Sequence, residues 1–154
     1  MSKQGCQEHD RKHREQRKVR QRQYYEKNRY RLCDYSLNHY CPKAIGQIVR
    51  LCPEAVNEYY NQYPFEEYGE PSIQRQLRCY RIFSDQARYQ DCYDAGMLAY
   101  LFSIHRCAYL GVENVRAYIN KMIRIYVICA LVIYDDARNL CKVNGFKEVR
   151  LDAW

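Results

Sequence analysis

The pattern of hydrophobic and polar positions predicts long helices in the second half of the chain. Apolar residues recur three and four positions apart over residues 91–110, and Gly111 stands where a glycine commonly ends a helix. A second pattern covers residues 112–136, and its stretch from Ile125 to Tyr134 is apolar on every side. Because a helix that is apolar all round is enclosed by its neighbours, we expect residues 112–136 to form a central buried helix. Its many β-branched residues leave a buried strand as the alternative.

Shorter helical stretches occupy the middle of the chain. Residues 43–51 and residues 54–63 carry apolar positions at helical spacing, and a proline that suits a first helical turn precedes each stretch. Two prolines and a glycine between Tyr63 and Pro71 predict a loop. Residues 72–89 then resume a helical pattern. The chain is therefore expected to have an all-α fold, a compact helical bundle, and its 154 residues suit one domain.

Charge divides the chain into a basic leader and a neutral body. Residues 1–31 contain eleven Lys and Arg against four Asp and Glu, a balance of +7 that equals the net charge of the whole chain. Residues 32–154 contain fourteen residues of each sign. We expect the leader to be an extended helix or disordered, and residues 32–154 to form a single all-α domain.

Clustered cations attract phosphate, because binding releases the counterions that a nucleic acid holds. RNA or DNA contact through residues 1–31 is therefore one function of the leader, and a nuclear import signal or a solvated helix is the other interpretation. The candidate nucleic-acid contacts are Arg11, Lys12, Arg14, Arg17, Lys18, Arg20 and Arg22. The leader lacks the apolar segment of a secretory signal, and no uninterrupted apolar run is long enough for a membrane span. We expect an intracellular protein of the nucleus or the cytoplasm.

The nine cysteines fit a reducing compartment better than a disulfide framework, since their number is odd. One group combines the ligand types that zinc prefers, namely Cys33, His39, Cys41 and Cys52. Its spacing lacks the closely placed cysteine pairs of structural zinc sites, so we expect no metal or other cofactor. An enzyme is not expected either, because the glycines are scattered singly and no catalytic motif occurs. His105 falls on an apolar helix face, as a core histidine does.

Tyrosine is the compositional outlier, with 17 residues. Tyrosine is frequent at protein interfaces, it stacks on unpaired bases beside basic residues, and it can replace phenylalanine in a core. The candidate partner-binding residues, expected to be exposed around the predicted loop, are Tyr59, Tyr60, Tyr63, Phe65 and Tyr68. The expected function is a helical protein–protein interaction or regulatory module, and nucleic-acid binding through the leader is the alternative.

Two stretches, Met97–Arg106 and Ile123–Asp136, resemble consecutive helices of the cyclin box. The second ends in Asp135-Asp136, as the family's helix does, with Tyr134 near the place of the family's lysine. The resemblance covers about 40 of the 154 residues and extends to the Speedy/RINGO-like kinase activators. It implies a helical fold and a protein kinase as the partner. The small size and the excess of Cys and Tyr also suit a viral accessory protein.

Overall fold

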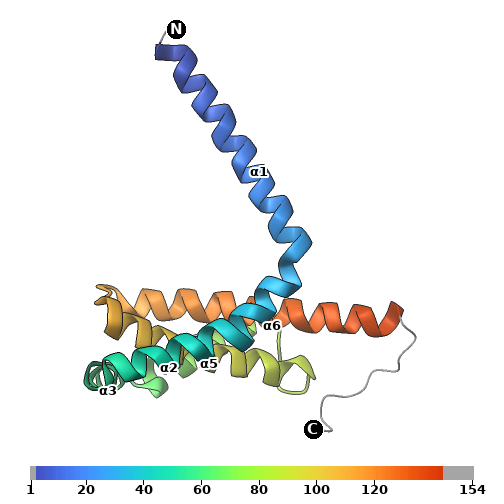
Figure 1. Ribbon diagram of the computed structural model, residues 1–154. Helices are drawn as coiled ribbons and strands as arrows, with labels where there is room; N and C mark the ends of the chain where they lie inside the picture. Colours follow the sequence, from blue (N-terminus) through green and yellow to red (C-terminus); the bar gives the residue numbers. More distant parts are fainter. Residues whose placement is uncertain (1–2, 144–154) are drawn as a thin grey trace.

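The computed structural model describes residues 3–143, and the side chains of residues 10–135 within them. Figure 1 shows an arrangement built from helices alone. The helices are α1 (Lys3–Tyr35), α2 (Cys41–Leu51), α3 (Pro53–Gln62), α4 (Glu70–Cys79), α5 (Arg88–Leu110) and α6 (Val115–Val143), with two π-helical turns, η1 (Ser36–Tyr40) and η2 (Phe65–Gly69). Residues 3–143 contain no strand, which confirms the all-α fold and rules out the strand alternative for Ile125–Tyr134.

Helices α5 and α6 lie side by side and form the largest interhelical contact (Figure 1). Helix α5 also contacts α2, α3 and α4, and it buries residues around most of its circumference. Small residues make this close packing possible. A Cβ atom added at Gly96 would lie 2.9 Å from Cγ1 of Ile73 in α4, so the two helices touch at that point. Counted among the α-helices, α5 therefore contacts the most neighbours.

The expectation that the stretch from Ile125 to Tyr134 is buried on every side is wrong. Ile125 is 40% exposed, and Ile128 and Leu131 are only half-buried. An apolar sequence determines how much surface a helix could bury, whereas the topology of the fold determines how many neighbours cover that surface. By length and hydropathy Val115–Asp135 could also cross a membrane, the one such stretch among the described residues. Core helices of soluble proteins share this property, and Ile123 and Val127 of the stretch are fully buried here.

The predicted helix over residues 72–89 is interrupted, because α4 ends at Cys79. Arg81 adopts a left-handed conformation with φ 54°, and the backbone N–H of Ile82 donates a hydrogen bond to the carbonyl oxygen of Leu77 (2.9 Å). This closing turn brings the Ile82 side chain into the core. The predicted loop before α4 is also shorter than expected, since η2 is a helical turn and Pro71 lies in the first turn of α4.

Helix α1 projects away from the rest of the molecule (Figure 1). Side chains from Asp10 to Arg31 are exposed except that of Asn28, which is half-buried. Among the described side chains, the first that is buried is Cys33, followed by Leu37 in η1 and Cys41 at the start of α2. The leader was expected to be either an extended helix or disordered, and the structure shows a helix. Only the C-terminal end of this helix packs against the body.

Candidate nucleic-acid interface

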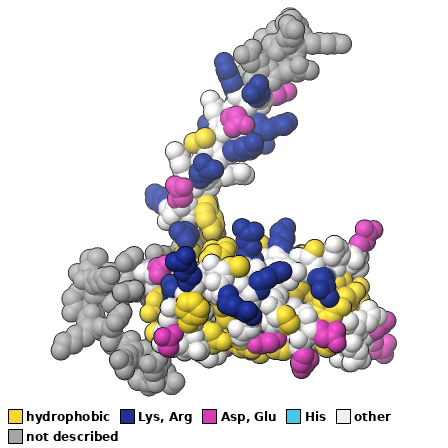
Figure 2. Space-filling view, turned by 180° about the vertical axis from the view of Figure 1, so that it is seen from behind, with side chains coloured by type: hydrophobic (Ala, Val, Ile, Leu, Met, Phe, Trp, Pro, Cys, Tyr) yellow, Lys and Arg dark blue, Asp and Glu magenta, His cyan; other side chains and the backbone are white. Residues whose placement is uncertain are grey.

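The projecting part of α1 concentrates the positive charge of the protein. Residues 10–31 carry ten Lys and Arg against Asp10, Glu15 and Glu26, and the side chains of all thirteen are exposed. Figure 2 shows Lys and Arg side chains along the coloured part of this helix. An ion pair joins Lys18 Nζ to Glu15 Oε1 at 3.3 Å, but three carboxylates cannot neutralise ten cations. The excess charge therefore faces solvent.

Each of the seven predicted nucleic-acid contacts lies on this one helix and is exposed. The helix rises about 1.5 Å per residue, so residues 10–31 present their charge over roughly 32 Å. Lys27, Arg29 and Arg31 are exposed on the same helix. The charge count of the leader already included these three residues, but only the continuous helix to Tyr35 places them on the same helix as the seven predicted contacts.

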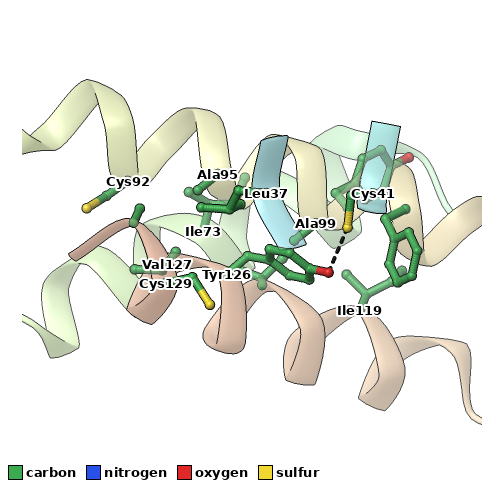
Figure 3. Packing of buried hydrophobic residues seen from close by; sticks show 14 of the residues in the cluster. Leu37, Cys41, Ile73, Cys92, Ala95, Ala99, Ile119, Tyr126, Val127 and Cys129 are labelled. Carbon is green, nitrogen blue, oxygen red and sulfur yellow. Dashed lines mark hydrogen bonds between the residues drawn. The ribbon is translucent and has the colours of Figure 1, made fainter. Parts of the chain in front are cut away.

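The root of α1 is fixed by a cluster of thiols and tyrosines. Cys41 Sγ donates a hydrogen bond to Tyr126 Oη of α6 (2.6 Å), and both side chains are buried (Figure 3). Burial raises the pKa of Cys41, and a hydrogen bond with Cys33, together with burial, raises the pKa of Cys129. Thiols with raised pKa values stay protonated and are poor nucleophiles. We therefore interpret this cluster as an anchor for α1 rather than as a reactive site.

The four candidate zinc ligands do not form a site. Cys41 is bonded to Tyr126, and Cys52 Sγ lies 3.5 Å from the carbonyl oxygen of Ile48, to which it donates. His39 is exposed, and its ring lies 5.8 Å from that of Tyr35. Within the described side chains, no three Cys, His, Asp or Glu residues come together in a way that could hold a metal ion.

The five candidate partner-binding aromatics are half-buried rather than exposed. Tyr100 Oη of α5 donates a hydrogen bond to the carbonyl oxygen of Tyr63 (2.8 Å), and the rings of Phe65 and Tyr100 meet edge to face at 5.2 Å. The Tyr60 ring contacts Tyr100 and His105. Burial raises the pKa of Tyr60 to about 12. These residues attach α3 and η2 to α5, so tyrosine here takes the packing role of phenylalanine.

His105 is a buried core residue. Its Nδ1 lies 2.7 Å from the carbonyl oxygen of Leu101 and 3.5 Å from Tyr60 Oη. Because a carbonyl oxygen only accepts, Nδ1 carries the proton and donates it to this bond. Nδ1 of this buried imidazole is thus bonded within the core.

The fold and the charge define a class of protein, namely an all-α body from which a long basic helix projects. Comparison with family models, with curated proteins and with solved structures finds no match for the chain.

Proposed function

We propose that this protein is a non-enzymatic nucleic-acid-binding module in which α1 contacts the phosphates of RNA or DNA. The observation that carries the proposal is the set of ten exposed cations on one helix that stands clear of a neutral body. Each phosphate that a cation neutralises releases condensed counterions, and this release drives binding at moderate salt.

The body contributes by holding the helix in place. Cys33, Leu37 and Cys41 are buried at the root, and the bond between Cys41 and Tyr126 connects the start of α2 to α6. A helix that is already formed loses less conformational entropy on binding than a disordered basic tail does. The helical body therefore supports the affinity of α1 without itself touching the ligand.

The test compares two variants of equal charge. In one, the seven predicted contacts on α1 (Arg11, Lys12, Arg14, Arg17, Lys18, Arg20 and Arg22) are changed to Gln. In the control, seven exposed cations of the body (Lys43, Arg50, Arg75, Arg78, Arg81, Lys121 and Arg124) are changed to Gln. Both variants lose seven positive charges, and Gln is about as good a helix former as Lys or Arg.

Binding of labelled RNA and DNA oligonucleotides is measured by fluorescence anisotropy between 50 and about 300 mM salt. We expect the α1 variant to lose binding, the body variant to retain most of it, and the affinity of the wild type to fall steeply with salt. No binding by the wild type at 50 mM salt, or equal losses in the two variants, would contradict the proposal.

A protein-binding role is the second candidate, with a protein kinase as the partner if the cyclin-box resemblance holds. The observation in its favour is that Met97 and Leu101, within the stretch that carries the resemblance, are exposed one turn apart on α5. Neighbouring apolar side chains that are exposed on one helix face are the kind of surface that protein contacts use. In nuclease-treated pull-downs, the absence of a kinase with the wild type would remove this candidate, and undiminished recovery of a kinase by the Met97→Ser/Leu101→Ser variant would show that this surface is not the contact.

A further inference from the structure

The faces of α1 differ in the side chains that they carry. Seven residues follow one another at spacings of three and four: His13, Arg17, Arg20, Tyr24, Lys27, Arg31 and Tyr35. At 3.6 residues per turn they all lie within about 60° of the direction of Tyr24. We call this row the outer stripe. The carboxylates of Glu15 and Glu26 lie roughly opposite it, while Asp10 lies near its N-terminal end.

The outer stripe is turned away from the body. Cys33, which is buried at the root, lies on the opposite side of the helix. Tyr25 and Arg29 also lie toward that side, where burial and a hydrogen bond with Cys33 raise the pKa of Tyr25. At the same level of the helix, Arg31 and Tyr35 remain exposed. A ligand can therefore follow the stripe from His13 past the root to Tyr35, roughly 33 Å, without meeting the body.

The stripe offers two kinds of contact in alternation. Arg17, Arg20, Lys27 and Arg31 supply positive charge, and a shallow hollow at its N-terminal half is lined by His13, Gln16, Arg17 and Arg20. Tyr24 is 61% exposed, and Tyr35 is 57% exposed although its ring lies 5.8 Å from that of His39. A second copy of α1 does not fit this surface, because its cations would repel those of the first.

The alternation of cations and tyrosines on the outer stripe suits single-stranded and duplex nucleic acid differently. In a duplex the faces of the bases are covered by stacking, so an exposed tyrosine ring gains little. An unpaired base has a free face that stacks on an aromatic ring, beside cations that hold the backbone. We propose that the outer stripe binds single-stranded nucleic acid, with its four cations on the phosphates and with Tyr24 and Tyr35 stacked on bases.

This inference rests on the proposed nucleic-acid function, and matched variants of the full chain test it separately. Tyr24→Ala removes a ring from the stripe, whereas Tyr30→Ala removes an exposed ring from another side of the same helix. Arg20→Gln and Arg22→Gln form a second pair, since Arg20 belongs to the stripe and Arg22 points nearly the opposite way. Circular dichroism checks that α1 stays helical in each variant.

Each variant is titrated with a single-stranded RNA 20-mer and with the duplex of the same sequence. We expect Tyr24→Ala to weaken single-strand binding roughly 5- to 150-fold, equivalent to about 1–3 kcal/mol per stacked base, and to leave duplex binding unchanged. Tyr30→Ala should change neither affinity by more than about twofold, and Arg20→Gln should weaken binding more than Arg22→Gln. With four phosphate contacts, the logarithm of the single-strand affinity should fall by roughly 3 per tenfold rise in salt.

The two proposals fail in different ways. Three results would overturn the stripe and leave the nucleic-acid function standing. They are equal effects of Tyr24→Ala and Tyr30→Ala, a duplex bound more tightly than the single strand, and a salt slope near the roughly 7 that ten contacts would give. No binding of either oligonucleotide by the wild type at 50 mM salt overturns both.

Discussion

Replacing Gly96 by alanine should destabilise the protein relative to the same change at Gly46. Both glycines lie inside helices, Gly96 in α5 and Gly46 in α2. An alanine stabilises the interior of a helix by about 0.5–1 kcal/mol relative to glycine. This gain is common to the two positions, so the difference between the two variants reports the surroundings of the added methyl group.

The surroundings differ sharply. No atom lies within 4 Å of a Cβ at Gly46, whereas a Cβ at Gly96 would lie 2.9 Å from Cγ1 of Ile73 and 3.2 Å from its Cδ1 and Cγ2. Carbon atoms prefer separations of about 3.5–4.0 Å. Ile73 is fully buried and cannot swing into solvent. Overpacking of this kind costs about 1–3 kcal/mol, which exceeds the gain from helix propensity over most of that range.

Urea unfolding followed by circular dichroism measures the free energy of unfolding of each variant. We expect Gly46→Ala to be more stable than the wild type and Gly96→Ala to be less stable, with a difference of about 1–3 kcal/mol between them. A double-mutant cycle with Ile73→Ala, which removes the three crowded atoms, should make Gly96→Ala stabilising. If Gly96→Ala stabilises the wild type as much as Gly46→Ala does, the close contact between α4 and α5 is not present.

Three further predictions concern the buried thiols. Tyr126→Phe removes the acceptor of the Cys41 thiol and should lower the free energy of unfolding by about 1 kcal/mol; an unchanged thermal midpoint would contradict this. Burial raises the pKa of Cys92 to about 12 and that of Cys107 to about 11, from 9.0. The folded state therefore holds these protons more tightly than the unfolded chain does, so the free energy of unfolding should be at its full value below about pH 9 and fall as the pH rises toward 11. Urea titrations that give the same free energy of unfolding over this range would refute the prediction. Iodoacetamide at pH 8 should modify the exposed Cys79 well before Cys92 and Cys107, and equal labelling by mass spectrometry would show that these two are accessible.

Local rules predicted several elements well. Pro42 and Pro53 lie in the first turns of α2 and α3, as their fixed backbone angle favours. Gly111 ends α5 in the left-handed conformation with φ 65°. The division between a basic leader and a neutral body was also available from the sequence, because it only requires counting charges.

Packing between distant residues decided the features that the sequence pattern does not predict. Nothing local to residues 72–89 predicts a break, since it depends on Ile82 entering a core built from other helices. The tyrosines around η2 were expected to be exposed, but Tyr100 of α5 binds the backbone of Tyr63 and draws that segment inward. A half-polar ring such as tyrosine suits both environments, so composition alone could not separate them.

The sequence by itself determined that this chain is helical and that its positive charge lies at one end, because helical periodicity and charge are properties of neighbouring residues. Only the tertiary structure decided which helix is enclosed and which face of α1 is free. The apolar stretch in α6 has the more hydrophobic sequence, yet α5 is surrounded because four helices converge on it. The outer stripe is visible as a spacing of three and four, but at the root of α1 its exposure follows from Cys33, whose burial fixes the opposite side of the helix against the body.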